Sequence, residues 1–207
     1  MSDAAAIGFR PHLGWASLIA IAGPVAAPHV IERRRIELAD RATPGSVQPY
    51  HFAESLELKK AEPWIEQCLN TSERMARDAI ALTVDKLRQQ GYHVRACGLV
   101  RSSARPLPEL ANVLASHALI HTAEGEMFRD ALTRASTHHG LPVLGVKERE
   151  LFGRCTTDLG IAVREIESRL AELGRMLGPP WRQDEKFATL VAWLALAAAA
   201  GKGTRKS

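Results

Sequence analysis

The stretch WASLIAIAGPVAAPHVIERRRIELAD, residues 15–40, decides the fold class. Residues 15–23 are an apolar run that ends at glycine and proline, which indicates a buried strand followed by a turn. Residues 29–40 carry the β-branched side chains of a second strand. We therefore predict an antiparallel hairpin, which the turn-like residues 42–49 bring to an end.

Downstream of the hairpin, helices alternate with apolar strands. Helical spacing with glycine stops predicts helices over about 51–60, 62–90, 108–139, 156–177 and 184–197. The apolar segments 92–100 and 141–146 indicate two further strands. Because a long helix precedes each of them, we expect right-handed parallel crossovers. The sequence thus predicts an α/β fold, with a mixed sheet made of the N-terminal hairpin and parallel strands and with helices on both faces.

The length of 207 residues suits one domain. We expect a flexible lead-in over 1–12, a single α/β domain over 13–200 and a disordered basic tail over 201–207. The uncharged run from Leu13 to Ile31 could mimic a signal peptide, but glycine and prolines interrupt it, and a hairpin explains it better. The three cysteines are widely spaced and form no CxxC pair. This pattern argues against a disulfide framework or a thiolate zinc site and favours a cytoplasmic setting.

The charge pattern permits several partners without requiring one. A net charge of +4 is compatible with a nucleic-acid partner, and nothing in the sequence predicts a membrane partner. Arg33, Arg34 and Arg35 can contact phosphates, although such charges on an edge strand can equally block pairing between sheets. The chain has no Walker loop, GxGxxG or GxSxG motif, so the nucleotide-binding and α/β-hydrolase classes lack their usual support.

The helical segment SHALIHTAEGEMFRDA, residues 116–131, carries the candidate site. At 100° per residue, His117, His121 and Glu124 fall within the apolar sector of this helix. Their spacing of four and then three residues stacks the side chains on successive turns. Burying each polar group without a partner costs roughly 1–3 kcal/mol, so something must meet them. Gly125 in the same helix indicates close approach of another element or a ligand.

Three interpretations of this helix stay open. Two imidazoles and a carboxylate can bind a divalent metal ion, or they can form a general acid–base site. They can also be a structural polar network that ties the helix to the sheet or to a second subunit. Tyr50 and His51 follow a turn and could approach the same helix, with a plain loop contact as the alternative.

The order of elements resembles the ribonuclease H-like fold, particularly its Holliday junction resolvase (RuvC-like) branch, over residues 13–196. The segment DEKFATLVAWLALA, residues 184–197, is similar to the final helix of that branch, which starts with acidic residues and continues with small apolar ones. Asp184 is the position that matches a metal-binding acid. The resemblance implies nuclease chemistry with divalent metal ions that several carboxylates hold.

Two acidic positions of the family differ in this chain. The family's first strand carries a catalytic aspartate, whereas residues 15–23 contain no acid. A resolvase has a glutamate where the strand 92–100 is followed by Arg101 and Ser102. Either the domain is a catalytically silent relative, or its chemistry lies on the helix with the two histidines and the glutamate.

The leading functional hypothesis is a hydrolase that acts on phosphodiesters. Its catalytic residues are His117, His121 and Glu124, and the same three side chains with Asp184 can hold a divalent metal ion. The alternative is a non-catalytic binding or scaffold module of the same fold, which could be a homodimer. A further hypothesis is nucleic-acid binding through the three consecutive arginines 33–35 without cleavage.

Overall fold

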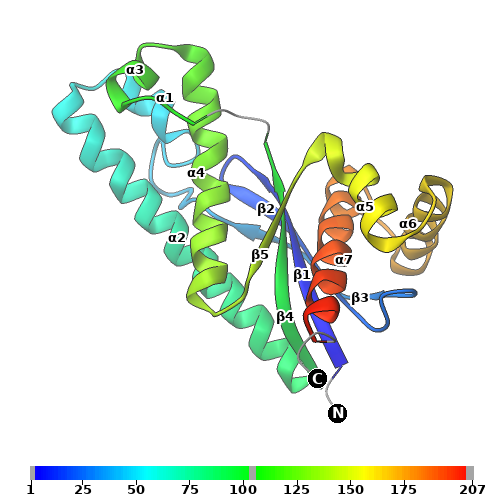
Figure 1. Ribbon diagram of the computed structural model, residues 1–207. Coiled ribbons are helices and arrows are strands. Elements are labelled where there is room, and N and C mark those ends of the chain that lie inside the picture. Colours follow the sequence, from blue (N-terminus) through cyan, green and yellow to red (C-terminus); the bar gives the residue numbers. More distant parts are fainter. Residues whose placement is uncertain (1–2, 103–105, 204–207) are drawn as a thin grey trace.

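The computed structural model describes residues 3–102 and 106–203, in which five strands form one mixed sheet in the order β3–β2–β1–β4–β5 (Figure 1). The strands are β1 (Asp3–His12), β2 (Trp15–Ala22), β3 (His29–Glu37), β4 (Tyr92–Arg101) and β5 (Val143–Lys147). β2 pairs antiparallel with both β1 and β3, whereas β4 runs parallel to both β1 and β5. The predicted hairpin and the predicted parallel strands are therefore confirmed.

Helices cover both faces of the sheet (Figure 1). Two long helices, α2 and α4, lie on one face, and α7 lies on the other with α5 and α6 outside it. The helical elements are α1 (Pro49–Glu54), α2 (Leu58–Gln89), α3 (Leu110–Leu114), α4 (His117–His138), the 3₁₀ turn η1 (Glu148–Glu150), α5 (Leu151–Leu159), α6 (Val163–Leu177) and α7 (Gln183–Gly203). Side chains alternate along β1, so that Ile7 and Phe9 pack towards α2 and α4, while Ala6 packs towards α7.

The prediction of a flexible lead-in over residues 1–12 is wrong. Residues 3–12 form β1, which lies in the middle of the sheet, with residues 5–9 buried. The segment is rich in alanine, which has a low strand propensity, and this hid the strand from a propensity argument. Because helices cover both faces, small apolar side chains are what the central strand needs here.

Two predicted helices are each divided in the structure. The helix expected over 108–139 consists of α3 and α4, which are separated at Ala115 and Ser116. The helix expected over 156–177 covers the end of α5, which already begins at Leu151, and all of α6. The break follows Gly160, whose φ of 69° ends α5 in a left-handed conformation. At the C-terminus, α7 continues to Gly203, and residues 204–207 of the expected tail lie outside the described residues.

Glycines in two neighbouring strands let α7 lie directly on the sheet. A Cβ atom on Gly8 of β1 would lie 1.9 Å from the carbonyl oxygen of Ala188, and one on Gly98 of β4 would lie 2.1 Å from that of Val191. Any side chain at either position would therefore push the helix away. The close contact places Asp184, in the first turn of α7, within reach of His12 at the end of β1.

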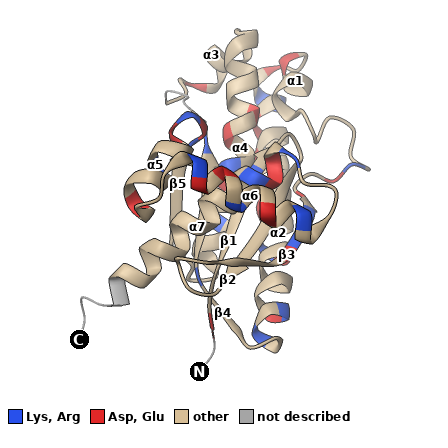
Figure 2. Ribbon diagram, turned by 90° about the vertical axis from the view of Figure 1, so that its right-hand side faces the viewer, with Lys and Arg blue, Asp and Glu red and all other residues tan. Residues whose placement is uncertain are grey.

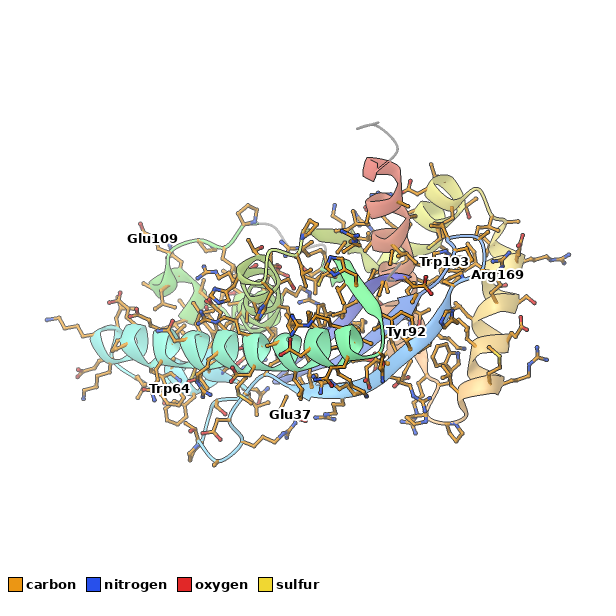
Figure 3. The ribbon with its side chains drawn as sticks, turned by 90° about the horizontal axis from the view of Figure 1, so that it is seen from below. Glu37, Trp64, Tyr92, Glu109, Arg169 and Trp193 are labelled. Carbon is orange, nitrogen blue, oxygen red and sulfur yellow. The ribbon has the colours of Figure 1, made fainter. Side chains whose placement is uncertain are left out.

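Trp193 joins α7 to its neighbours on the same face. Its indole Nε1 donates a hydrogen bond of 2.8 Å to the carbonyl oxygen of Val25 in the hairpin turn, and Arg169 of α6 lies 5.6 Å over its ring (Figure 3). The apolar middle of α7 is thus explained by burial. Within the described parts of the chain, no helix combines the length and the hydropathy that crossing a membrane requires.

Candidate functional site

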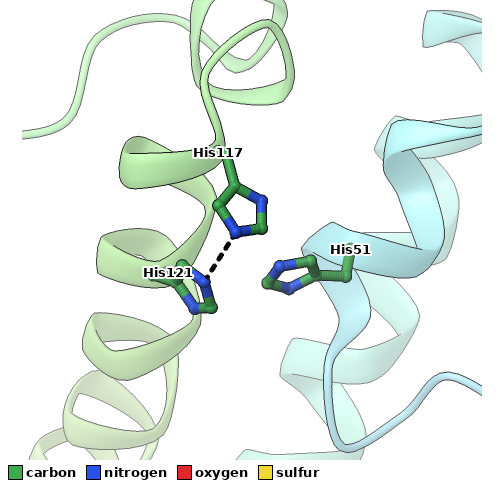
Figure 4. Close-up of side chains that lie close together, drawn as sticks. All are labelled: His51, His117 and His121. Carbon is green, nitrogen blue, oxygen red and sulfur yellow. Dashed lines mark hydrogen bonds between the residues drawn. The ribbon is translucent and has the colours of Figure 1, made fainter.

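Three histidines from two elements meet beside the start of α4. His51 lies in α1, and His117 and His121 lie one turn apart at the start of α4 (Figure 4). Each ring offers one nitrogen, and these three atoms lie within 4.8 Å of one another. The Nε2 atoms of His117 and His121 are 3.1 Å apart. We refer to His51, His117 and His121 as the histidine cluster.

Local sequence explains how α1 presents His51. Pro49 occupies the first turn of α1, where its fixed φ suits a helix start and its missing N–H is not needed. Trp64 of α2 anchors this start, because its indole Nε1 donates a hydrogen bond of 3.1 Å to the carbonyl oxygen of Pro49. His51 is therefore held two residues into a short helix whose origin is fixed against α2.

Glu124 is buried directly behind the histidine cluster. Its carboxylate is 0% exposed. Oε1 accepts a hydrogen bond of 3.2 Å from the backbone N–H of His51 and lies 2.9 Å from Nδ1 of the same residue. An ionised carboxylate can only accept, so a neutral His51 ring that pairs with it would carry its proton on Nδ1 and its lone pair on Nε2. Oε2 is buried and has no hydrogen-bond partner among the described residues.

The structure brings His117 and His121 into contact and connects Glu124 with them through His51. Glu124 is buried as predicted, whereas His117 and His121 are exposed, so the expectation that all three lie on a buried stripe is wrong. All three residues lie on one face of the unbroken α4, but the first turns of that helix lie beside α1, where His117 and His121 meet His51 and stay exposed. His51 joins the cluster with its ring stacked edge-on against both partners, at centroid distances of 5.1 and 4.6 Å. The sequence analysis named His51 only as a residue that could approach this helix, with a plain loop contact as the alternative.

Asp184 lies elsewhere, with a different histidine. Its Oδ1 is 2.8 Å from Nε2 of His12, and the histidine cluster does not include it. This pair is at the carboxyl edge, by which we mean the ends of β1 and β4 with the side chains that surround them. His12 was missed because it lies in the segment assigned as a lead-in. The apolar run over residues 4–9, which is followed by the polar residues Arg10 and His12, is the signal that could have found it.

Three arginines gather at the carboxyl edge. Arg10 lies near the end of β1 and pairs with Glu148 at 2.7 Å, Arg101 ends β4 and lies 3.8 Å from Asp130, and Arg129 of α4 lies 3.5 Å from Glu126. Burial lowers the pKa of Arg129 below its ordinary value; Glu126 opposes this shift, and the charges of Arg10 and Arg101 add to it. In Figure 2, basic and acidic segments intermingle around α4, α5 and β5.

The arginines 33–35 make contacts within the protein. Arg33 donates hydrogen bonds of 2.7 and 2.6 Å to the carbonyl oxygens of Gly178 and Pro180. Arg34 donates to the carbonyl oxygen of Ala79 and to Thr83 at 2.6 and 2.8 Å. Arg35 lies 4.1 Å over the ring of Trp15 and pairs with Glu37 at 2.8 Å. Nucleic-acid binding by these arginines stays a prediction, and their internal contacts lend it no support.

Comparison with known proteins finds similar solved structures but no match to a family model or to a curated protein. No protein-family model matches the chain, and no curated protein matches its sequence. RuvC of Thermus thermophilus in complex with a Holliday junction substrate is similar at a TM-score of 0.55 and 10% identity, over 97% of this chain and 96% of that one. A second Thermus thermophilus RuvC structure is similar at 0.54 and 13% identity, over 97% of each chain. The fold is ribonuclease H-like, of the RuvC type.

The metal ions implied by the RuvC-type fold do not fit the residues at the carboxyl edge. A two-metal nuclease needs several carboxylates that converge on two cations. Here the ends of β1 and β4 carry Arg10 and Arg101, and Arg129 adds a third guanidinium group. Asp184 is engaged by His12. The carboxylates of Glu126, Asp130 and Glu148 are each paired with one of these arginines rather than directed together at a cation, so the residues at this edge do not fit a metal pair and we derive no catalytic step through one.

Proposed function

We propose that this RuvC-type domain is a hydrolase of phosphodiester bonds in nucleic acid, and that its reaction centre is the histidine cluster. The observation that carries the proposal is the pairing of buried Glu124 with His51 beside two exposed imidazoles. The similarity to RuvC, which one of the similar structures contains together with a Holliday junction, supports nucleic acid as the substrate class.

The arrangement suits the activation of a water molecule. Glu124 fixes the ring of His51 with the proton on Nδ1, so that the lone pair on Nε2 is available. The exposed rings of His117 and His121 leave room for water and for a substrate to approach. A carboxylate that orients an imidazole also stabilises positive charge as it develops on that ring. Groups positioned in this way typically contribute 10²–10⁴-fold to the rate of a hydrolysis.

The position of the cluster on α4 separates it from the carboxyl edge. His121 and Arg129 are eight residues apart, which corresponds to about 12 Å along the helix axis. A substrate phosphate at the cluster is thus distinct from one bound among the arginines. The proposal assigns the chemistry to the first turns of α4, while the arginines lie where the fold's metal ions would be.

The proposal is tested by incubating the purified chain with labelled single-stranded DNA, duplex DNA, RNA and four-way junctions. We expect cleavage of at least one substrate, and Glu124→Gln should reduce the rate by 10²-fold or more because the ring of His51 loses its charged partner. The matched control is Glu66→Gln, on the exposed side of α2, which should keep the full rate. Absence of cleavage of every substrate, or equal rates for wild type and Glu124→Gln, would contradict the proposal.

The second candidate is a nucleic-acid-binding module without chemistry. The observation that favours it is the group of Arg10, Arg101 and Arg129 at the carboxyl edge, where parallel strands usually present their ligand sites. Guanidinium groups pair well with phosphates. This candidate predicts an affinity for DNA or RNA that falls steeply as the salt concentration rises. Arg101→Ala should weaken that affinity, and no cleavage should occur.

A further inference from the structure

We infer that His51, His117 and His121 bind one zinc ion through their imidazole nitrogens, with Glu124 as the residue that orients His51. The inference concerns the same cluster as the proposed hydrolase and names its metal. It rests on that proposal only for the use to which the ion is put, because the ion can bind whether or not the chain cleaves nucleic acid.

The distances suit a single small ion. Zinc–nitrogen bonds of about 2.0–2.1 Å at tetrahedral angles place two ligand nitrogens roughly 3.3–3.4 Å apart. The Nε2 atoms of His117 and His121 are 3.1 Å apart, and the candidate atom of His51 lies within 4.8 Å of both. Small rotations of exposed side chains bring all three to bonding distance. The spacing of four residues on α4 gives the pair, and α1 supplies the third ring.

The donor set selects the class of metal. Imidazole nitrogens suit zinc, copper, iron and nickel, whereas calcium and magnesium prefer oxygen ligands. The three ligands here are all imidazoles, without a thiolate or a directly bound carboxylate. Three protein ligands on a tetrahedral ion leave one open position, as in zinc sites that perform catalysis.

Glu124 is an independent indication of a cation. Its side chain is completely buried, its Oε2 has no hydrogen-bond partner, and its ion-pair partner among the described residues is His51 alone. A buried carboxylate is costly unless positive charge compensates it. A zinc ion on the far side of the His51 ring supplies that charge. Carboxylates that accept the second N–H of a ligating histidine are a common outer shell of such ions.

The open position gives the ion a chemical use. His117 and His121 are exposed, so solvent reaches the ion. With the ion bound, the lone pair of His51 would be used in the bond to zinc, so the ion rather than the free ring would activate the water. Zinc would lower the pKa of that water molecule to about 7. The hydroxide would attack phosphorus as the bond to the leaving oxygen breaks, the proton released from the water would pass to solvent, and the leaving oxygen would take up a proton from solvent.

Metal binding is measured directly on the full chain without a histidine tag. The protein is stripped with a chelator, dialysed and titrated with zinc against a chromophoric competitor, and metal content is determined by elemental analysis. We expect one zinc per chain in the wild type and at least 100-fold weaker binding in His117→Ala/His121→Ala. The matched control His138→Ala, an exposed histidine at the other end of α4, should bind as the wild type does.

Two further measurements separate the outcomes. Glu124→Gln should weaken zinc binding by about 10–100-fold while the circular dichroism spectrum stays that of a folded protein. Cobalt in place of zinc should give the strong visible absorption of a tetrahedral site. A wild type that holds no zinc at about 10 µM free ion, a concentration well above the dissociation constants that zinc-binding free energies of roughly 10–16 kcal/mol imply, overturns the inference. A double variant that binds zinc as well as the wild type overturns it too. If zinc binds at one per chain and no substrate is cleaved, the hydrolase proposal fails and the zinc site stands.

Discussion

At the scale of single residues, the structure gives neighbouring arginines different tasks. Arg33 clamps the segment after α6 through the carbonyl oxygens of Gly178 and Pro180, whereas Arg35 lies exposed between Trp15 and Glu37. A sequence shows only three consecutive basic residues. Which of them is structural depends on loops far away in the chain, and composition does not contain that information.

Replacing Arg33 should destabilise the fold more than replacing Arg35. Hydrogen bonds from a charged donor typically contribute about 1.5–3 kcal/mol, and the carbonyl groups of Gly178 and Pro180 are only partly buried or exposed, so Arg33→Ala should lower the free energy of unfolding by about 1.5 kcal/mol, the lower end of that range. Arg35→Ala, which removes an exposed ion pair, should lower it by less than about 1 kcal/mol. Urea denaturation measures both. If both variants lowered the free energy of unfolding equally and only slightly, the hydrogen bonds from Arg33 to Gly178 and Pro180 would not form in solution.

The buried cysteines predict a loss of stability at alkaline pH. Burial raises the pKa of Cys97 to about 12, against a smaller opposing effect of Ser136, and burial first and Asp158 next raise that of Cys155 to about 12. An unfolded thiol titrates near 8.5. The folded state therefore keeps a proton that the unfolded state loses, and this contribution to stability is complete below about pH 8.5 and is lost as the pH rises towards 12.

The measurement is the free energy of unfolding in urea between pH 7 and pH 10. We expect it to fall above pH 8.5, and the fall should be shallower in Cys97→Ala, which removes one of the raised thiols. A free energy that stays constant to pH 10, or a variant with the same pH dependence as the wild type, would contradict this expectation.

At the scale of elements, the strands and helices that sequence patterns describe well are those with large apolar side chains. The hairpin, the strand β4 and the long helix α2 follow from such patterns, and the structure has all three. β1 was missed because its residues are small, and their fit depends on the covering helix α7. The sequence likewise revealed only part of the candidate site. His117, His121 and Glu124 share one helix, whereas His51 comes from α1, and only the fold brings it near.

Gly8 tests how closely α7 packs on the sheet. Gly8→Ala would place a methyl group 1.9 Å from the carbonyl oxygen of Ala188. This oxygen belongs to the backbone of α7, so it cannot move aside unless the helix moves. We expect a loss of roughly 2–3 kcal/mol or more in the free energy of unfolding. The matched control is Gly153→Ala in α5, where a Cβ would meet nothing within 4 Å and alanine should stabilise the helix by about 0.5–1 kcal/mol. A Gly8→Ala variant as stable as the wild type would contradict the packing.

At the scale of the whole molecule, the fold depends on its first strand. β1 pairs with β2 on one side and with β4 on the other, so it joins the antiparallel half of the sheet to the parallel half. Removing residues 1–12 should prevent cooperative folding rather than trim a loose end. Circular dichroism and urea denaturation of the truncated chain test this. A truncated chain that unfolds with the midpoint of the full chain would show that the sheet does not need β1.

The whole molecule has the RuvC-type fold with two separate groups of polar side chains. Arginines lie near the ends of β1 and β4, and the convergent imidazoles lie at the start of α4. On our proposal, the chain keeps the framework and uses the start of α4 for its reaction. A homodimer, which the sequence left open, stays a prediction.

The most direct test of this account compares two single variants on one phosphodiester substrate. The rate constant kcat/KM is measured for the wild type, His121→Ala and Asp184→Asn on bis(4-nitrophenyl) phosphate with zinc present. We expect His121→Ala to lose about 100-fold or more, and Asp184→Asn, at the carboxyl edge, to stay within about threefold of the wild type. If Asp184→Asn abolishes the reaction and His121→Ala does not change it, the reaction centre lies at the carboxyl edge and the account is wrong.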